Sequence, residues 1–414
     1  MRRLKRISIV LIIFVLLFVT ACSSNENVEE TNGDDVITGD ASLLTEPNNK
    51  LGFELLQYVE LVEDNIFISP YSAFAAILLA YNAAEGETKV EMAESLYIDD
   101  ISLDEVNGAM LALTKALQKN DENITMTVVN SIWLNDVFHF NESYSKQTER
   151  YFDAINETIN IDDDASVDKM NDWVKEATNE KITDMVKKPL HPDFIAMILN
   201  AIYFNGKWQY PFDEANTMED AFFVGNEELT VPFMMLEEDE LAYMENELFQ
   251  AVQLPYGSGE MNMQIFLPNE KVDLASFSEQ LTEENWRIWN SEFRPLSGVV
   301  KLPKFQIEYE TSLNEALQQL GMNKAFDEQL AQFPNMIEED ERIFIHEVKQ
   351  KTYIEVTEEG TEAAGATSVE MRLTSAIIDE ETFYMEINRP FFFTITDEET
   401  NVILFIGMIQ NPTQ

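Results

Sequence analysis

Residues 358–375 read EEGTEAAGATSVEMRLTS, and this stretch decides between the candidate folds. From Thr361 onward, every second side chain is small or apolar: Thr361, Ala363, Gly365, Thr367, Val369, Met371 and Leu373. This alternation predicts a β-strand with one face fit for burial. The first half of the stretch is nevertheless rich in glycine and alanine, which form strands poorly. The segment can therefore form a strand but has only a weak intrinsic preference for one. A flexible alanine-rich surface loop is the alternative interpretation.

The chain around this stretch contains both helices and strands. Apolar residues recur at helical spacing over residues 51–62 and 106–117, whereas residues 261–267 and 402–406 have the composition of strands. Because the strands are not each followed by a helix of regular length, an α+β fold with antiparallel sheets is favoured over a doubly wound parallel sheet. No Gly/Ser-rich or Pro-rich break and no fixed-period repeat interrupts residues 48–414, which predicts a single domain.

The composition excludes several classes of protein. The 414 residues are 45% hydrophobic, which is enough to build a large core and argues against disordered and fibrous chains. The 76 acidic side chains outnumber the 27 basic ones and give a formal net charge of −49. Such a surface repels polyanions, so we expect neither nucleic acid nor a heparin-like polyanion as a partner.

The amino terminus predicts export. Four basic residues precede the apolar run Ile7–Val19, as in a secretory signal peptide, which we assign to residues 1–21. The sequence Val19-Thr20-Ala21-Cys22 resembles the bacterial lipobox, which implies that Cys22 carries a lipid and anchors the protein at the bacterial cell surface, facing the extracellular side. The alternative for Cys22 is a buried free thiol. Residues 22–47 are polar and acidic and predict a linker, and membrane contact is expected only through the lipid.

The sequence lacks the residue patterns of common active sites. His139, His191 and His346 have no metal-ligand spacing, and Cys22 is the only cysteine. Neither a phosphate-binding glycine loop nor a Gly-x-Ser-x-Gly turn occurs. We therefore expect no enzyme activity, no metal and no cofactor. The aromatic run from Trp208 to Phe212 is interpreted as core packing.

Residues 358–367, EEGTEAAGAT, are similar to the reactive-loop hinge of the serpin family of protease inhibitors. Other family signatures follow one another in the expected order: NIFISPYS (65–72), NAIYFNGKW (200–208), VKLPKF (300–305), NRPF (388–391) and FIGMIQNP (405–412). The resemblance covers residues 48–414. It implies three β-sheets with about nine α-helices, and an exposed reactive-centre loop over about residues 358–382.

The resemblance also implies a mechanism. A serine protease cleaves the loop, forms an acyl-enzyme, and is trapped when the cleaved loop inserts into the main β-sheet, so that the inhibitor is a suicide substrate. The chain would act as a monomer. Alternatives are a non-inhibitory serpin that binds another molecule, a cross-class inhibitor of cysteine proteases and, more remotely, a lipid-anchored solute-binding protein or enzyme.

Site residues carried over by the resemblance form three groups. The hinge comprises Glu358, Gly360, Thr361, Ala363, Ala364, Gly365, Ala366 and Thr367. The spacing from Glu358 places the reactive bond at Thr374–Ser375, which suits elastase-like or subtilisin-like proteases. Cleavage at Arg372–Leu373 is the alternative and would suit a trypsin-like protease.

The third group is the shutter, a polar cluster beneath the point where the sheet opens. The resemblance assigns Ser69, Ser72 and Asn200 to it, and the position at which the family has a histidine is Gln350. A glutamine amide can still donate and accept hydrogen bonds, but it supplies no protonation switch.

Overall fold

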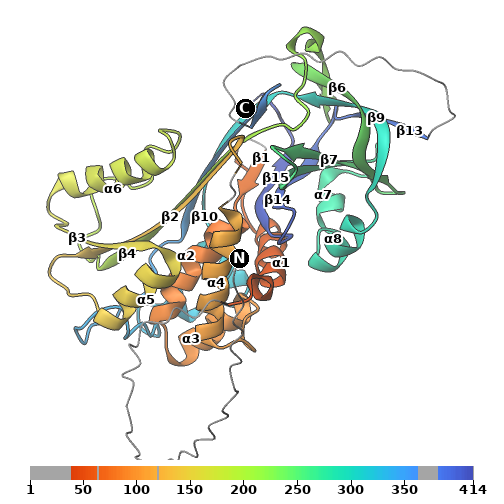
Figure 1. Ribbon diagram of the computed structural model, residues 1–414. Helices are drawn as coiled ribbons and strands as arrows, with labels where there is room; N and C mark the ends of the chain where they lie inside the picture. Colours follow the sequence, from red (N-terminus) through yellow and green to blue (C-terminus); the bar gives the residue numbers. More distant parts are fainter. Residues whose placement is uncertain (1–38, 63–64, 119–120, 362–380, 414) are drawn as a thin grey trace, which may run out of the picture. The chain divides into compact units, whose positions relative to one another are not determined.

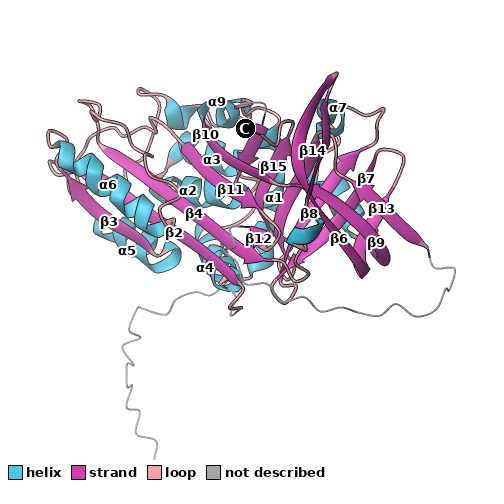
Figure 2. Cartoon of the chain, turned by 90° about the horizontal axis from the view of Figure 1, so that it is seen from above, coloured by secondary structure: helices cyan, strands magenta, loops and turns pink. Residues whose placement is uncertain are grey.

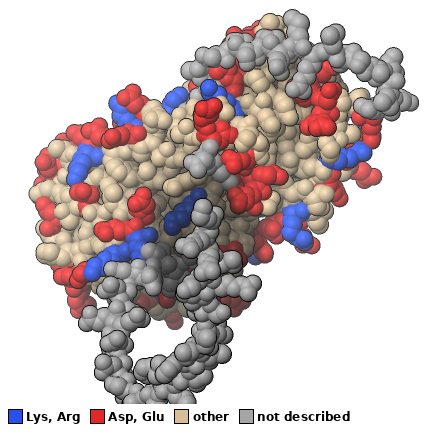
Figure 3. Space-filling model, in the orientation of Figure 1, with Lys and Arg blue, Asp and Glu red and all other residues tan. Residues whose placement is uncertain are grey.

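The computed structural model describes residues 39–62, 65–118, 121–361 and 381–413. The predicted signal peptide, Cys22 and the residues of the predicted reactive bond lie outside the described residues. No helix within these ranges is long and apolar enough to cross a membrane. Acidic side chains are spread over the face shown in Figure 3, and basic side chains form smaller groups there.

The described residues contain nine α-helices, and most of them start at a capped end. Ser69 accepts a hydrogen bond from the backbone of Ser72 at the start of α2, and Ser102 forms a capping box with Glu105 at the start of α4. The helices are α1 (Thr45–Leu56), α2 (Pro70–Ala83), α3 (Gly86–Ser95), α4 (Leu103–Leu117), α5 (Glu142–Phe152), α6 (Asp164–Ala177), α7 (Leu274–Ser278), α8 (Glu283–Asn290) and α9 (Asn314–Gln319). Three short 3-10 helices are η1 (Ala41–Leu44), η2 (Glu214–Asn216) and η3 (Lys324–Phe326).

The strands of the described residues form two hydrogen-bonded sheets, shown from above in Figure 2. The six-stranded sheet has the order β10 (Phe305–Ser312), β11 (Lys349–Val356), β12 (Gly360–Thr361), β4 (Ala196–Lys207), β2 (Ile124–Asn135) and β3 (Ala154–Ile159). The nine-stranded sheet has the order β1 (Asn65–Ile68), β15 (Ile403–Ile409), β14 (Phe391–Asp397), β8 (Met261–Pro268), β7 (Phe249–Tyr256), β6 (Glu227–Glu245), β9 (Arg294–Pro303) and β13 (Thr382–Glu386), with β5 (Met218–Val224) paired to β6. All pairs are antiparallel except β2 with β3 and β9 with β13. The α+β class with largely antiparallel sheets is therefore confirmed.

Two of the three expected sheets are joined by backbone pairing into the nine-stranded sheet. Strand β6 is 19 residues long and pairs with β5 over residues 227–233, with β9 over residues 233–243 and with β7 over residues 242–245. Because β6 pairs with β5 and β9 and also with β7, it belongs to two of the expected sheets and connects them.

The core lies between the two sheets around α2 (Figure 1). Phe67 of β1 stacks on Phe405 of β15, with ring centroids 5.2 Å apart. On the other face of the six-stranded sheet, α6 packs Met170 and Val174 against Trp133 of β2, in a separate hydrophobic cluster. The six-stranded sheet is therefore covered by α2 on one face and by α6 on the other.

The folded body begins earlier than residue 48, where the sequence analysis placed it. Helix η1 and the first turn of α1 lie within the predicted linker, and Asp40 caps η1 by accepting from the backbone of Ser42. A Cβ atom on Gly39 would lie 2.3 Å from the backbone nitrogen of Ala109, so this glycine lies directly against α4. The linker boundary is corrected because these tertiary contacts order residues whose composition is typical of a linker.

Candidate functional site

The start of the predicted hinge lies inside the six-stranded sheet. Strand β12 consists of Gly360 and Thr361 and lies between β11 and β4, where Thr361 pairs with Val356 on one side and Gly206 on the other. Thr361 is 2% exposed, and its Oγ1 shares a hydrogen bond of 2.7 Å with Tyr256 Oη. The side chain of Thr361 thus faces the core, as the period-two pattern predicted.

A tight turn precedes β12. The backbone N–H of Thr357 donates to the carbonyl of Gly360, and the N–H of Gly360 donates back to the carbonyl of Thr357. Gly360 has φ +150°, and a Cβ atom there would lie 2.1 Å from the carbonyl oxygen of Gly206. Only glycine allows β4 to approach this closely, which explains the residue type at the hinge.

Aromatic residues after β4 hold the turn from the other side. The Trp208 indole donates to the Thr357 carbonyl at 2.9 Å, and its ring stacks on Tyr256 with centroids 4.4 Å apart. The backbone of Trp208 donates to the Glu359 carbonyl, and the backbone of Phe212 donates to the Glu358 carbonyl. The interpretation of Trp208 and Phe212 as core packing was incomplete, because both residues are buried and also bind the hinge.

Glu358 anchors the same turn through its side chain. Its carboxylate accepts hydrogen bonds from Lys304 Nζ at 2.7 Å and from Thr217 Oγ1 at 2.8 Å. Burial raises the pKa of Glu358, but the hydrogen bonds from Lys304 and Thr217 outweigh burial and leave this pKa below its ordinary value. A lowered pKa in the folded state means that the anchor contributes stability above the unfolded pKa of about 4.3 and loses it as the pH falls through the folded pKa.

A Glu358→Ala variant should be less stable than the wild type by about 1–3 kcal/mol at neutral pH, because Lys304 and Thr217 lose a charged partner. Urea unfolding measures this difference. The neighbouring carboxylate in Glu359→Ala is the matched control, and we expect a change below about 0.5 kcal/mol there. The difference between the wild type and Glu358→Ala should shrink on acidification below about pH 4. Equal destabilisation by both substitutions would contradict this role of Glu358.

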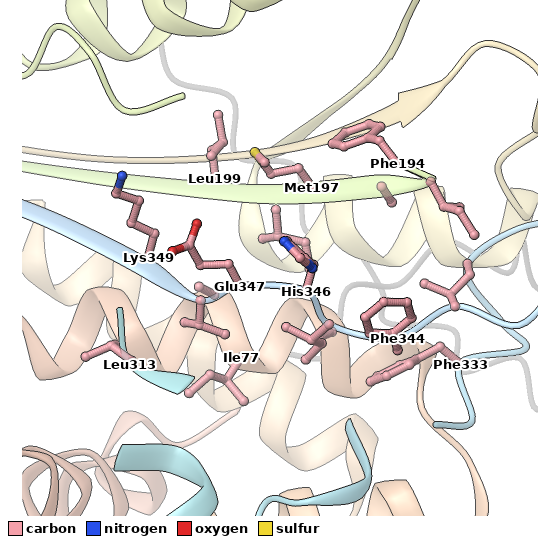
Figure 4. Close-up of a pocket in the computed structure, with 18 of the residues that line it drawn as sticks. Ile77, Phe194, Met197, Leu199, Leu313, Phe333, Phe344, His346, Glu347 and Lys349 are labelled. Carbon is pink, nitrogen blue, oxygen red and sulfur yellow. The ribbon is translucent and has the colours of Figure 1, made fainter. Parts of the chain in front are cut away.

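A cavity of about 480 Å³ lies between β4 and β11, toward the ends of the strands that are remote from β12. Its walls come from residues 194–200, from residues 342–350 and from α2 below them, including Ile77. Figure 4 shows Met197 and Leu199 on the β4 side, Glu347 and Lys349 on the β11 side, and Ile77 beneath. None of the described strands lies between β4 and β11 at this level. The cavity therefore interrupts the sheet between these two strands, and its floor is apolar.

The predicted shutter residues lie together where the cavity meets α2. Gln350 is 4% exposed, and its amide binds the backbone of Ser69 twice: Oε1 accepts from the N–H at 2.9 Å and Nε2 donates to the carbonyl at 2.8 Å. Ser72 Oγ donates to Asn200 Oδ1, and Asn200 Nδ2 donates to Asn130 Oδ1 at 2.6 Å. Sequence reasoning missed Asn130, which faces Asn200 across the β2–β4 ladder. The cluster connects β11, α2, β4 and β2.

A Gln350→Ala variant should lose about 1–3 kcal/mol of stability, because the buried backbone of Ser69 loses two hydrogen bonds. A Gln350→His variant is the matched replacement, since imidazole also donates and accepts. Burial disfavours the charged imidazole. The stability of Gln350→His relative to the wild type should therefore fall as the pH is lowered from about 7.5 to about 5.5. Urea midpoints across this range measure the difference. A pH-independent difference would contradict the placement of residue 350 in a buried cluster.

His346 does not take the place of the shutter histidine. It is exposed and stacks on His191, with ring centroids 5.9 Å apart, at the far end of the cavity. His139 lies elsewhere, with Nδ1 2.7 Å from a carboxylate oxygen of Glu339. The three histidines are thus not gathered into one site.

The remaining site predictions fall on residues that the structure does not describe. Hinge residues Ala363, Ala364, Gly365, Ala366 and Thr367 lie there, as do both candidate reactive bonds. The chain re-enters the described residues at Glu381, immediately before β13.

Comparisons with known proteins agree with this arrangement. The sequence model of the family described as Serpin (serine protease inhibitor) matches residues 46–412. An uncharacterized serpin-like protein of Methanosarcina mazei is 30% identical over 434 residues, with 99% of each chain covered. Iripin-2 of Ixodes ricinus is 32% identical over 373 residues, which cover 88% of this chain and 93% of the relative. The crystal structure of the thermophilic serpin tengpin in the native state is similar with a TM-score of 0.82 and 29% identity, covering 94% of this chain and 96% of tengpin. This chain therefore belongs to the serpin family.

Proposed function

We propose that this protein inhibits serine proteases as a suicide substrate, by inserting its cleaved reactive loop between β4 and β11. The observation that carries the proposal is the position of β12, which starts such a strand at one end of the sheet while a cavity lies between the same two strands at the other end. A loop that continues from Thr361 would run between these two strands toward the cavity.

The register of β12 supports the fit of the loop to this track. Thr361 lies opposite Gly206 and Val356, so each further loop residue would lie opposite residues one step earlier in both β4 and β11. Continued by six residues, the register brings Thr367 between Asn200 and Gln350. Alternate residues share a face of a strand, so Thr367 would lie on the same face of the sheet as Thr361. A small hydroxyl-bearing side chain is compatible with the polar shutter at that level.

Loop insertion would be strongly favourable. Residues 362–371 would lie between residues 196–205 of β4 and residues 346–355 on the β11 side. About ten new backbone hydrogen bonds at a net ~1 kcal/mol each would contribute about 10 kcal/mol. That is comparable to the whole stability of an ordinary domain. Insertion with this driving force would be effectively irreversible, and the protease is trapped when insertion is completed before the acyl-enzyme hydrolyses.

Insertion would also move the protease. If Thr374 carries the acyl bond, it lies thirteen residues beyond Thr361, which corresponds to roughly 43 Å along a strand. A protease attached at this point would be carried to the opposite end of the sheet, beyond His346. Such a displacement would pull the acyl-enzyme against the inhibitor body and distort its active site.

Mass spectrometry after incubation with elastase, subtilisin and trypsin tests the proposal and identifies the reactive bond. Cleavage at Thr374–Ser375 would release residues 375–414 on denaturation, whereas cleavage at Arg372–Leu373 would release residues 373–414. We expect the first fragment, together with a denaturant-stable complex between the protease and residues up to 374. Cleavage without any such complex would contradict inhibition and indicate a non-inhibitory serpin. A complex with a cysteine protease instead would identify a cross-class inhibitor.

We also propose that the protein is exported and anchored at the bacterial cell surface through a lipid on Cys22. The lipobox-like run before this cysteine supports the proposal. In bacteria that express the full chain, the wild type should be recovered in the membrane fraction, whereas a Cys22→Ala variant should be absent from it. Equal membrane recovery of both proteins would contradict the anchor.

A further inference from the structure

Four strands at one end of the nine-stranded sheet have one buried and one exposed face. On β5, β6, β9 and β13, one face carries buried apolar side chains such as Met234, Val300 and Met385. The other face carries large apolar side chains that remain accessible: Met218 is 65% exposed, Tyr384 is 56% exposed and Met235 is 37% exposed. Because most exposed positions of a sheet are polar, three such side chains on one face are typical of an interaction surface.

The register of the strands places the exposed side chains on one face, in successive rows. Directly opposed residues point to the same face of a sheet. Tyr384 lies opposite Val299, which lies opposite Glu237, and in the next row Glu386 lies opposite Lys301, which lies opposite Met235. Met218 lies opposite Phe233, one row beyond Met235. We call this surface the β13 face and define it by Met218, Met235, Glu237, Lys301, Tyr384 and Glu386.

The charge of the β13 face is negative. Its lysine is neutralised locally, because Lys301 Nζ lies 2.6 Å from a carboxylate oxygen of Glu386 and also binds Asp220. The side chain of Lys301 is only 14% exposed, whereas that of Asp220 is 50% exposed. Glu237 adds a further exposed carboxylate. An approaching protein therefore meets apolar side chains surrounded by acidic groups.

Chain length indicates what would cover this face. The predicted reactive bond at Thr374–Ser375 is only seven residues before Thr382, where β13 begins. Seven extended residues span at most about 25 Å. A protease of about 220 residues has a radius of gyration of roughly 17 Å, so one that holds the reactive bond cannot lie far from the β13 face. The alternative bond at Arg372–Leu373 lengthens the tether by only two residues.

We infer that the β13 face is a docking surface for the target protease, and that it selects proteases with basic and apolar side chains around the active-site cleft. This inference rests on the proposed inhibitory function and adds a determinant of specificity that lies outside the reactive bond. Electrostatic complementarity acts mainly on the rate of association. The face should therefore change how fast a protease is captured, but not whether the captured protease is trapped.

The test compares association rates of the full-length protein with subtilisin and with a basic elastase, at about 20 mM and about 500 mM NaCl. A Met235→Ser, Tyr384→Ser double variant should associate roughly five- to tenfold more slowly with the elastase. Glu237→Gln should weaken the dependence of that rate on salt. The stoichiometry of inhibition should stay as in the wild type. Tyr58→Ser is the matched control, because Tyr58 is 46% exposed beyond the end of α1, and its rate should stay within about twofold.

The outcomes separate this inference from the proposed function. Unchanged rates in the double variant and in Glu237→Gln, with stable complexes still formed, would overturn the docking surface and leave the inhibitory function standing. If the wild type itself forms no complex with either protease, both are overturned. A dimer of the wild type that Tyr384→Ser dissociates would show that a second copy of this chain occupies the face instead. If the double variant does not fold, Glu237→Gln alone decides.

Discussion

A Thr361→Arg variant should be cleaved by target proteases as a substrate instead of trapping them. Thr361 lies between β4 and β11, is 2% exposed and shares a hydrogen bond with the buried Tyr256 hydroxyl. A guanidinium at this position would lose its hydration without gaining a carboxylate, and burying an unpaired charge costs several kcal/mol. In the uncleaved protein this cost would drive residue 361 out of the sheet, and the same cost would oppose its return at the start of the inserting strand. Insertion should therefore be delayed until the acyl-enzyme has hydrolysed.

The number of inhibitor molecules consumed per protease inactivated should rise more than roughly tenfold in this variant, as measured by titration of residual protease activity. Thr361→Ser retains the hydroxyl and should behave as the wild type. Thr361→Val removes the hydrogen bond to Tyr256 but adds no charge, so it should remain an inhibitor with a hinge weakened by about 1 kcal/mol. If Thr361→Arg yields as much denaturant-stable complex as Thr361→Val, inhibition does not require residue 361 to lie between β4 and β11.

The inward face of the hinge could be predicted from sequence because strand periodicity is local. Alternation from Thr361 placed this residue on the face fit for burial, and the structure buries it. Gly360 could also be recognised, since a glycine beside a strand indicates a position where another backbone approaches closely. Both inferences need only residues adjacent in the chain.

The partners of the hinge could not be predicted in this way because they are far away in sequence. Tyr256 is 105 residues before Thr361, and Lys304 is 54 residues before Glu358. Nothing in the local sequence of β7 marks Tyr256 as the residue that meets the hinge. Trp208 gave a partial signal, since a buried indole N–H usually needs an acceptor, but its acceptor on Thr357 depends on how β4 and the hinge turn meet.

The start of the fold and the cavity in the sheet were missed for a related reason. Residues 41–47 read ASLLTEP and are too few to show a periodicity of their own. Gly39 nevertheless fits against α4 and η1 follows it, which only the tertiary structure determines. The sequences of β4 and β11 read as ordinary strands of a sheet interior. A pattern within each strand reports burial, but it carries no information about whether the two strands pair with each other.

Protein cleaved in the reactive loop should unfold at a temperature roughly 15–20 °C above that of the intact protein. The cavity of about 480 Å³ between β4 and β11 is where an inserted strand would add its hydrogen bonds and bury Val369 and Met371. About 10 kcal/mol from hydrogen bonds and about 2 kcal/mol from each apolar side chain give about 14 kcal/mol. A chain of this size unfolds with an entropy of about 0.8 kcal/mol per kelvin, which converts that gain into the expected shift.

Differential scanning calorimetry of intact and nicked protein measures this shift, with the nick mapped by mass spectrometry. Nicked Thr361→Arg is the matched control, because its loop is cut at the same bond while the buried charge opposes insertion. Its unfolding temperature should therefore rise by only a few degrees. If nicked wild type and nicked Thr361→Arg unfold at the same temperature, the cleaved loop does not stabilise the protein by inserting between β4 and β11. The free energy that is proposed to trap the protease would then have no structural source.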